Sequence, residues 1–162
     1  MKAITIIQPW ATLIALGEKK FETRSWATKH RGDIAIHAGK KIDKKACEAE
    51  PIRSTLSDHG YTVDNLPTGA VVAMCQLEDC WEVIGEINFP VGGTAVLNDS
   101  TGTKVYGITP DNNELYFGDY SKGRFAWEIN AVKWLEVPIP AKGQQGLWNW
   151  EPKEQGGILN EP

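Results

Sequence analysis

The sequence predicts an α+β fold, a small mixed-sheet β-barrel of five to six strands with two or three short helices on its surface. Strand-type patterns recur along the chain, helical patterns are short, and the two do not alternate in the rhythm of βαβ units. The chain has 162 residues, of which 41% are hydrophobic and 23% charged. This is enough to bury one core, and we expect a single domain over residues 1–150.

The chain opens with a strand, a short helix and a second strand. Residues 2–7, KAITII, are rich in β-branched side chains and predict the first strand. Residues 8–17 predict the helix, because Pro9 suits a first helical position and Gly17 suits the left-handed conformation at a helix end. Residues 20–26 then alternate with the period of a strand that has one charged face.

Two further strands are expected in the first half of the chain. Residues 33–38, DIAIHA, place Ile34 and Ile36 toward the core and leave His37 on the opposite face. Residues 70–77 are almost continuously apolar. That pattern is typical of a strand buried on both faces.

Two short helices are expected between these strands. Asp43 is a good N-cap for a helix that runs to Ala49. Pro51 can start another turn or two through Leu56, before Gly60 ends it. Both helices would lie on the surface of the barrel.

Residues 85–122 differ from the rest in composition. They are rich in Gly, Asn and Asp and contain only short apolar pieces. We expect a long loop insertion, or a loop with a small hairpin, and a loop of this length is typically either a functional lid or flexible. It is also the segment through which we expect any protein partner to bind.

The C-terminal part resumes the strand pattern. Residues 124–137 predict a strand that Pro138 and Pro140 end. Residues 143–150 predict a final aromatic strand or hook, and residues 151–162 predict a flexible tail. Four tryptophans are expected in the core or as a lid over it: Trp127, Trp134, Trp148 and Trp150.

Charge is unevenly distributed along the chain. Residues 1–45 hold ten Lys or Arg against four Asp or Glu, although the whole chain has a formal charge of −4. If these bases share one face, that face could hold phosphates while the acidic remainder keeps the protein soluble. The alternative is a scatter of solvated lysines.

Several classes of protein are excluded. No apolar run approaches the roughly 20 residues of a membrane helix, and the apolar N-terminus lacks a signal-peptide cleavage site, so we expect a cytoplasmic protein. Cys47, Cys75 and Cys80 form no CxxC pair and are expected to be buried free thiols. The three histidines are scattered, and we expect neither a metal site nor a cofactor.

The main candidate site combines Lys19, Glu22 and Arg24. The Arg24 guanidinium suits a phosphate or the polar edge of a base, Lys19 could act as a point charge or as a general acid or base, and Glu22 could orient either one or accept a proton. Strand parity instead groups Lys20 with Glu22 and Arg24, so which lysine faces the cleft is open. The alternative is a surface ladder worth under about 1 kcal/mol per pair.

Five further side chains are candidates. Gln8 and Trp10 flank the start of the first helix, where Trp10 could stack on a base or belong to the core. His37 could reach the cleft with Lys40, or be a structural histidine. Glu128 follows the small Ala126 on one strand face and could serve as a carboxylate near a ligand, or pair with a basic neighbour.

The segment GEKKFETR, residues 17–24, resembles the GxKxxExR signature of the ASCH family. The resemblance continues in four more segments that extend to Trp150: QPWA (8–11), RGDIAIHAGK (31–40), GRFAWE (123–128) and KGQQGLWNW (142–150). It implies a PUA-like β-barrel and an RNA-binding or nucleotide-binding module.

The resemblance also implies possible chemistry. Some bacterial members of the family resemble amidohydrolases acting on N4-acetylcytidine, in which the signature Lys and a Thr three residues later are catalytic, and other members are thought to cleave RNA. Lys19 matches the Lys, but Glu22 stands at the Thr position. That difference places binding ahead of amide hydrolysis.

Three functions therefore compete. The first is binding of RNA or a nucleotide-like ligand in a cleft formed by Gln8, Trp10, Lys19, Glu22, Arg24, His37 and Lys40. The second is hydrolysis of RNA or a modified nucleoside, with Lys19 as the reactive group and Glu22 or Glu128 as its acid–base partner. The third is a protein-interaction module that uses residues 85–122. Fold alone does not choose among them.

Overall fold

The computed structural model describes residues 1–89 and 92–152, without the side chains of residues 88–92. The tail expected at 151–162 lies outside the described residues from residue 153 onward. The elements, in chain order, are β1 (Lys2–Gln8), α1 (Trp10–Ala15), β2 (Phe21–Arg24), β3 (Gly32–Ile42), α2 (Lys44–Glu48), α3 (Ile52–Asp58), β4 (Ala70–Phe89), β5 (Gly92–Asn98), β6 (Val105–Ile108), the 3₁₀ helix η1 (Asn113–Tyr116), β7 (Phe125–Pro140) and β8 (Leu147–Asn149).

All eight strands belong to one mixed sheet. Six of them follow the order β2-β7-β4-β3-β1-β8, and β5 and β6 extend from the outer part of β4. The β1–β3 pair is parallel and the other pairs are antiparallel. The α+β class with three short α-helices is confirmed.

Closure of the sheet into a barrel is not observed among the described residues. In the strand order β2 and β8 stand at opposite ends, and they share no backbone ladder in the described parts of the chain. β8 pairs with β1 only as far as Leu147 opposite Ile4. The edge of β1 beyond Ile4 therefore faces β2 without a strand between them.

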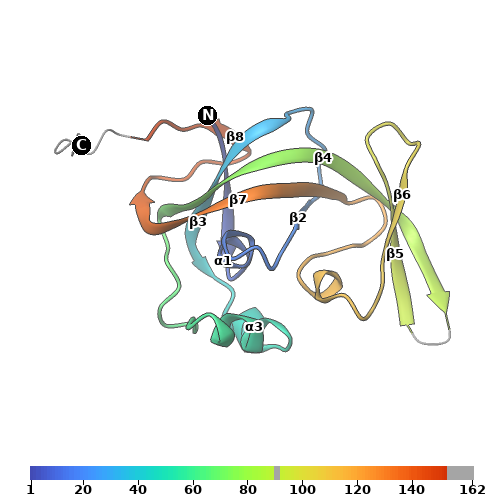
Figure 1. Cartoon of the computed structure of the whole chain (residues 1–162), viewed down its shortest axis with the longest axis horizontal. Coiled ribbons are helices and arrows are strands. Elements are labelled where there is room, and N and C mark those ends of the chain that lie inside the picture. The colour runs from blue at the N-terminus through green and yellow to red at the C-terminus, as the bar shows by residue number, and fades with distance from the viewer. Residues whose placement is uncertain (90–91, 153–162) are drawn as a thin grey trace.

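The main core lies between the sheet and α1. Trp127 packs there with Ile34 and Ile36, which confirms the predicted inward face of β3. The opposite face of β3 is buried as well, because Trp148 and Trp150, from the C-terminal part of the chain, cover it. The helices α2 and α3 form a separate cluster below, visible at the foot of the molecule in Figure 1.

The local signals at the helices are confirmed. The Asp43 carboxylate accepts a hydrogen bond from the amide of Ala46 and caps α2. α3 begins directly after Pro51, and Gly60 follows its end with a positive φ of 81°. Residues of neither helix line the cleft described below.

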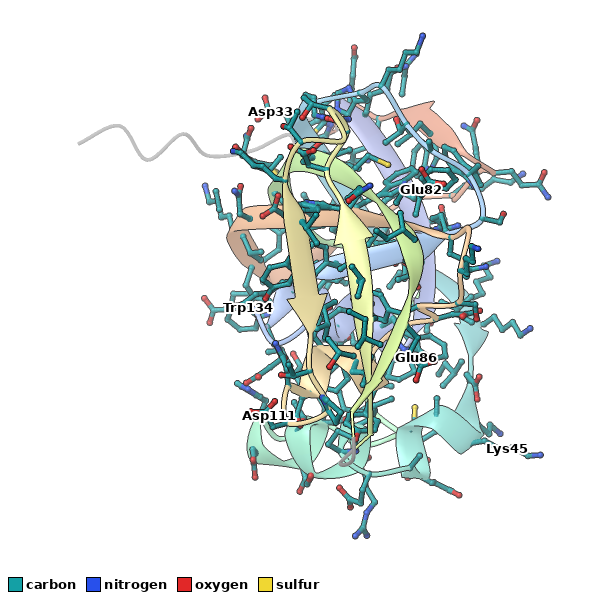
Figure 2. The ribbon with its side chains drawn as sticks, turned by 90° about the vertical axis from the view of Figure 1, so that its right-hand side faces the viewer. Asp33, Lys45, Glu82, Glu86, Asp111 and Trp134 are labelled. Carbon is teal, nitrogen blue, oxygen red and sulfur yellow. The ribbon has the colours of Figure 1, made fainter. Side chains whose placement is uncertain are left out.

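The segment expected to be a long loop, or a loop with a small hairpin, contains the antiparallel pair β5–β6 and the outer end of β4. β4 continues to Phe89 and is followed by β5, β6 and η1. β5 and β6 form an arm beside the outer half of β4, seen from its exposed side in Figure 2. The arm packs on β2 through the buried side chains of Leu97 and Ile108, which join Val83 of β4 around Phe21. It is therefore part of the domain core and also displays the exposed Val105.

Two expectations for β7 were wrong. The strand does not end at Pro138 but runs to Pro140, which pairs with Ala70 of β4. β2 pairs only with residues 125–128 of β7. In the described chain, residues 138–140 therefore pair with β4 alone, and the missing N–H groups of the two prolines on the other side break no ladder. Trp134, expected in the core or over it, lies on that open strand with 48% of its surface exposed.

Cys47, Cys75 and Cys80 are buried and free, as predicted, and burial raises the pKa of the Cys75 thiol to about 12. Across the described residues, every helix is too short or too polar to span a membrane.

Candidate functional site

The end of α1 decides which lysine turns inward. Gly17 takes a φ of 75°, and the amides of Glu18 and Lys19 both donate to the carbonyl of Leu13 at 3.0 Å. The chain reverses so tightly that the Lys19 side chain enters the protein, with only 1% of its surface exposed, while Lys20 is exposed. Lys19 is therefore the lysine beside Glu22 and Arg24.

Lys19 lies beneath the cleft floor. Its Nζ donates to the carbonyl of Phe117 at 2.5 Å. Burial lowers the pKa of Lys19 from its ordinary value of 10.5, while the nearby carboxylates of Glu22 and Glu114 act in the opposite direction and the Arg24 charge adds to the lowering. In its protonated form, Lys19 would place beneath the floor a positive charge that solvent screens weakly.

A cleft of about 490 Å³ occupies the gap between the free edge of β1 and the strand β2. Arg24 spans the gap, since its Nη2 donates to the backbone carbonyl of Thr5 at 2.8 Å. The side chains of Trp10 and Ile7 also line the cleft. The cleft thus exists where a closed barrel would have placed another backbone ladder.

Glu22 and Arg24 each have a polar atom without a hydrogen-bond partner among the described residues. Glu22 Oε1 lies 3.9 Å from Arg24 Nε, too far for a hydrogen bond. Glu22 Oε2 and Arg24 Nε are buried without a hydrogen-bond partner in the described part of the chain. A buried acceptor and a buried donor without partners cost folding free energy unless a ligand or a water molecule forms their hydrogen bonds.

A further wall, attached to β2, comes from residues 116–119, which the sequence analysis did not name as site residues. Asp119 donates its amide to Thr23 Oγ1 at 3.0 Å, and its carboxylate lies 3.4 Å from Arg124 Nε. A Cβ on Gly118 would come within 2.9 Å of the Thr23 side chain, so only glycine lets the wall approach β2 this closely.

Glu114 attaches this wall to β2. Its carboxylate accepts hydrogen bonds from the amides of Lys20 and Phe21 at 2.9 and 3.0 Å, and from the Tyr120 hydroxyl at 3.2 Å. Burial, together with Glu114, raises the pKa of Tyr120. Nothing in the sequence pattern distinguishes Glu114 from the other acids of this polar segment, so it was missed.

The cleft carries both signs of charge. Arg24 and Arg124 face it, with Lys19 beneath, against Glu22 and Asp119. Hydrogen bonds from the Ser121 hydroxyl and amide, helped by Arg124, hold the pKa of Asp119 below its ordinary value of 3.8. Such a mixture suits a ligand that has an anionic group and hydrogen-bond donors, rather than a simple anion.

Three candidate residues lie elsewhere or serve the scaffold. Gln8 is fully buried and bonds through its amide to Thr12 and to the carbonyl of Pro67, so it holds the start of α1. Trp10 both lines the cleft and packs against two core clusters. Glu128 accepts a hydrogen bond from Trp81 Nε1 at 3.2 Å and is not among the residues that line the cleft.

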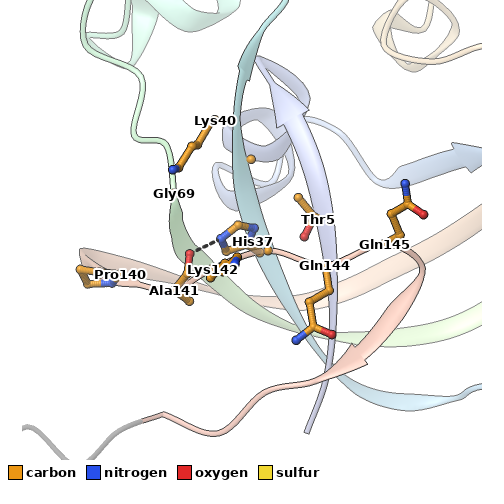
Figure 3. A pocket seen from close by; sticks show the side chains of 11 residues that line it. Thr5, His37, Lys40, Gly69, Pro140, Ala141, Lys142, Gln144 and Gln145 are labelled. Carbon is orange, nitrogen blue, oxygen red and sulfur yellow. Dashed lines mark hydrogen bonds between the residues drawn. The ribbon is translucent and has the colours of Figure 1, made fainter.

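His37 and Lys40 line a second cavity of about 990 Å³ (Figure 3). His37 is 98% buried, and its Nε2 donates to the carbonyl of Ala141 at 2.7 Å. Its Nδ1 has no partner among the described residues. Thr5 lines both cavities, so the predicted site residues are divided between two adjoining hollows.

Comparison with known proteins identifies the family of the chain. The human and the mouse Activating signal cointegrator 1 are each 34% identical to the chain over 80 residues, which is 48% of this chain and 14% of each relative. The chain thus spans about a seventh of the length of these relatives. The family model of the ASCH domain matches residues 4–136, which include the cleft-lining residues from Thr5 to Arg124. The chain belongs to the ASCH domain family, part of the PUA-like superfamily.

Proposed function

We propose that the protein binds RNA or a nucleotide-sized ligand in the cleft between β1 and β2. The observation that carries the proposal is that Glu22 Oε2 and Arg24 Nε, in a cleft of about 490 Å³, are both buried and find no hydrogen-bond partner among the described residues. An acceptor beside a donor complements the edge of a nucleobase, which also presents donors next to acceptors. Membership of the ASCH family supports an RNA-related function.

Each residue of the cleft has a distinct role in the proposed binding. Arg24 and Glu22 contact the base edge, and Trp10 offers an aromatic surface at the side. Arg124 supplies a second positive group near the opening. Lys19 contacts no ligand directly; its charge stabilises anionic groups from below and its bond to Phe117 holds the wall.

A binding titration tests this function. Fluorescence anisotropy of a labelled single-stranded RNA, and calorimetry with nucleoside monophosphates, should show saturable binding at low salt. Arg24→Ala should weaken it at least about tenfold, which is the loss expected for a charged hydrogen-bonding partner. Arg53→Ala removes an equally charged but exposed arginine on α3 and should have no effect. A flat titration with wild-type protein would exclude the function.

A second candidate is hydrolysis of RNA or of a modified nucleoside such as N4-acetylcytidine. The observation in its favour is Lys19, a buried amine with a lowered pKa beside Glu22. A neutral amine there could take a proton from an attacking water. Incubation with N4-acetylcytidine and with an RNA pool should then yield product, and Lys19→Ala should abolish it. Product formation that survives Lys19→Ala would exclude this role.

A further inference from the structure

The second cavity is basic. Lys40 and Lys142 lie at its rim with the amides of Gln144 and Gln145, and none of its lining residues is acidic. In Figure 3, Lys40 and Gln145 lie on opposite sides of His37 and Thr5. The cleft, in contrast, contains two carboxylates. The second cavity therefore favours a purely anionic group, whereas the cleft favours a group with its own donors.

The segment that carries Lys142 is fixed from two sides. Ala141 receives the hydrogen bond of His37 and donates its own amide to the carbonyl of Gly69 at 3.0 Å. Gly143 lies so close to the sheet that a Cβ there would come within 2.7 Å of His37 Cε1 and 2.8 Å of Thr5 Oγ1. The backbone on either side of Lys142 is thus held against β1 and β3, so the ammonium is presented from a rigid base.

Thr5 connects the two cavities. On the cleft side its carbonyl accepts the hydrogen bond of Arg24, and on the other side its hydroxyl accepts one from Trp148 Nε1 at 3.2 Å. β8 begins at Leu147 opposite Ile4, so among the described residues β8 does not pair with Thr5 at this edge of β1, although Gly143 packs against the Thr5 side chain. The two hollows therefore meet at Thr5, and a flexible chain that follows their openings beside Gly143 reaches both.

We propose that a single RNA strand crosses Thr5, with one base in the cleft and the phosphate of a neighbouring nucleotide on Lys40 and Lys142. This rests on the function proposed above and assigns the second cavity to the RNA backbone. The two lysines contact phosphate oxygens, a contact that is independent of base sequence. The amides of Gln144 and Gln145 can donate to the same phosphate or to its ribose.

A length series tests the path. Wild-type protein should bind a single-stranded oligonucleotide more tightly than a nucleoside monophosphate, because only the oligonucleotide reaches both cavities. In the variant Lys40→Ala/Lys142→Ala, oligonucleotide affinity should fall about tenfold or more. Its salt slope, log K against log salt, should become shallower by about 1.4 for two lost phosphate contacts. Both lysines are exposed, so the fold should persist, and thermal unfolding verifies this.

The control is Lys45→Ala/Lys133→Ala, which changes the net charge equally at two exposed lysines that line neither cavity. An equal loss in both variants, or an unchanged affinity and salt slope in Lys40→Ala/Lys142→Ala, overturns the proposed path. If wild-type protein binds the monophosphate through Arg24 while the Lys40→Ala/Lys142→Ala variant loses no more oligonucleotide affinity than the control variant, only the proposed path is wrong. If wild-type protein binds neither probe, the proposed function fails with it.

Discussion

Lys19 is the residue on which the site depends, and its energetics follow from burial. A fully buried ammonium with a single hydrogen bond to a carbonyl has lost most of its hydration. Glu22 and Glu114 offset part of that cost through their charge. The side chain is therefore tolerated by the fold because of its neighbours, and its proton should be weakly held.

The first prediction concerns the stability of Lys19→Met as a function of pH. In the folded protein the pKa of Lys19 lies below its ordinary value of 10.5, so between those two values the unfolded chain binds more protons. The free energy of unfolding of the wild type should therefore rise with pH relative to the variant across that interval. Urea unfolding of both proteins from neutral pH to pH 10.5 measures the difference.

The slope of that difference is bounded at about 1.4 kcal/mol per pH unit, because one proton is involved. Below the lowered pKa both states of the wild type are charged, and the difference should be constant. All other titrating groups are common to the two proteins and largely cancel. A difference that falls as the pH rises would mean that Lys19 is not destabilised by burial.

At the level of single residues, the sequence identified part of the cleft. Glu22 and Arg24 belong to a charged strand pattern and to the family signature, and both line the cleft. Lys19 was identified only through the signature, because strand parity favours Lys20. The reversal after Gly17 overrides parity, and no periodicity extends through such a turn.

At the level of elements, η1 and the residues after it form a wall attached to β2. Phe117 packs in the helical cluster with Leu13 and Leu56, and Glu114 bonds to the backbone of β2. The arm, η1 and β2 therefore form one cooperative unit. Deletion of residues 85–122 would remove the wall that residues 116–119 form, so it is not a clean test of a separate interaction surface.

Glu114→Ala provides a sharper test at this level. It leaves the amides of Lys20 and Phe21 without their acceptor, at a cost of about 1–3 kcal/mol for each buried group. We expect the free energy of unfolding to fall by roughly 2–4 kcal/mol in urea titrations. RNA binding should weaken as well, because the wall loses its attachment.

Glu48→Ala is the matched control, since it removes an exposed carboxylate from α2 and should change stability little. Glu114→Gln should lose less stability than Glu114→Ala, because the glutamine carbonyl oxygen can still accept from one amide while its NH₂ group cannot accept from the other. Wild-type stability in Glu114→Ala would show that the wall does not depend on this carboxylate.

The elements themselves were unequally predictable. β1, β3, α2 and α3 follow local signals, such as the Asp43 cap and the positive φ of Gly60. β5 and β6 are short and lie among turn residues, and their burial depends on packing against Phe21 from a distant part of the chain. Strands that are stabilised in this way by tertiary contacts show only a weak pattern in their own sequence. The length of β7 was missed because its prolines face an unpaired edge.

At the level of the whole molecule, the open sheet explains the cleft. β2 reaches the exposed edge of β1 through the Arg24 side chain instead of through a ladder, which leaves room for a ligand. The basic N-terminal part of the chain contributes Arg24 to the cleft and Lys40 to the neighbouring cavity. The acidic remainder contributes Asp119, Arg124 and Lys142, so the site draws on both parts of the chain.

The α+β class and the mixed sheet could be predicted from strand count and the lack of βαβ rhythm. Whether the sheet closes into a barrel could not be predicted, because closure depends on whether two strands that are distant in the sequence meet in register. Local sequence patterns do not encode that. The split of the site into two cavities also depends on the position of Thr5 between β2 and the segment around Gly143. That juxtaposition arises only when both ends of the sheet are folded.

The most direct test of the central claim is NMR chemical-shift mapping with a single-stranded RNA titrated into isotope-labelled protein. We predict that the amides of Thr23, Arg24, Gly118 and Asp119, which line the cleft on β2 and on the wall attached to it, shift first and saturate together. Shifts confined to α2 and α3, or no shifts at saturating RNA, would contradict it.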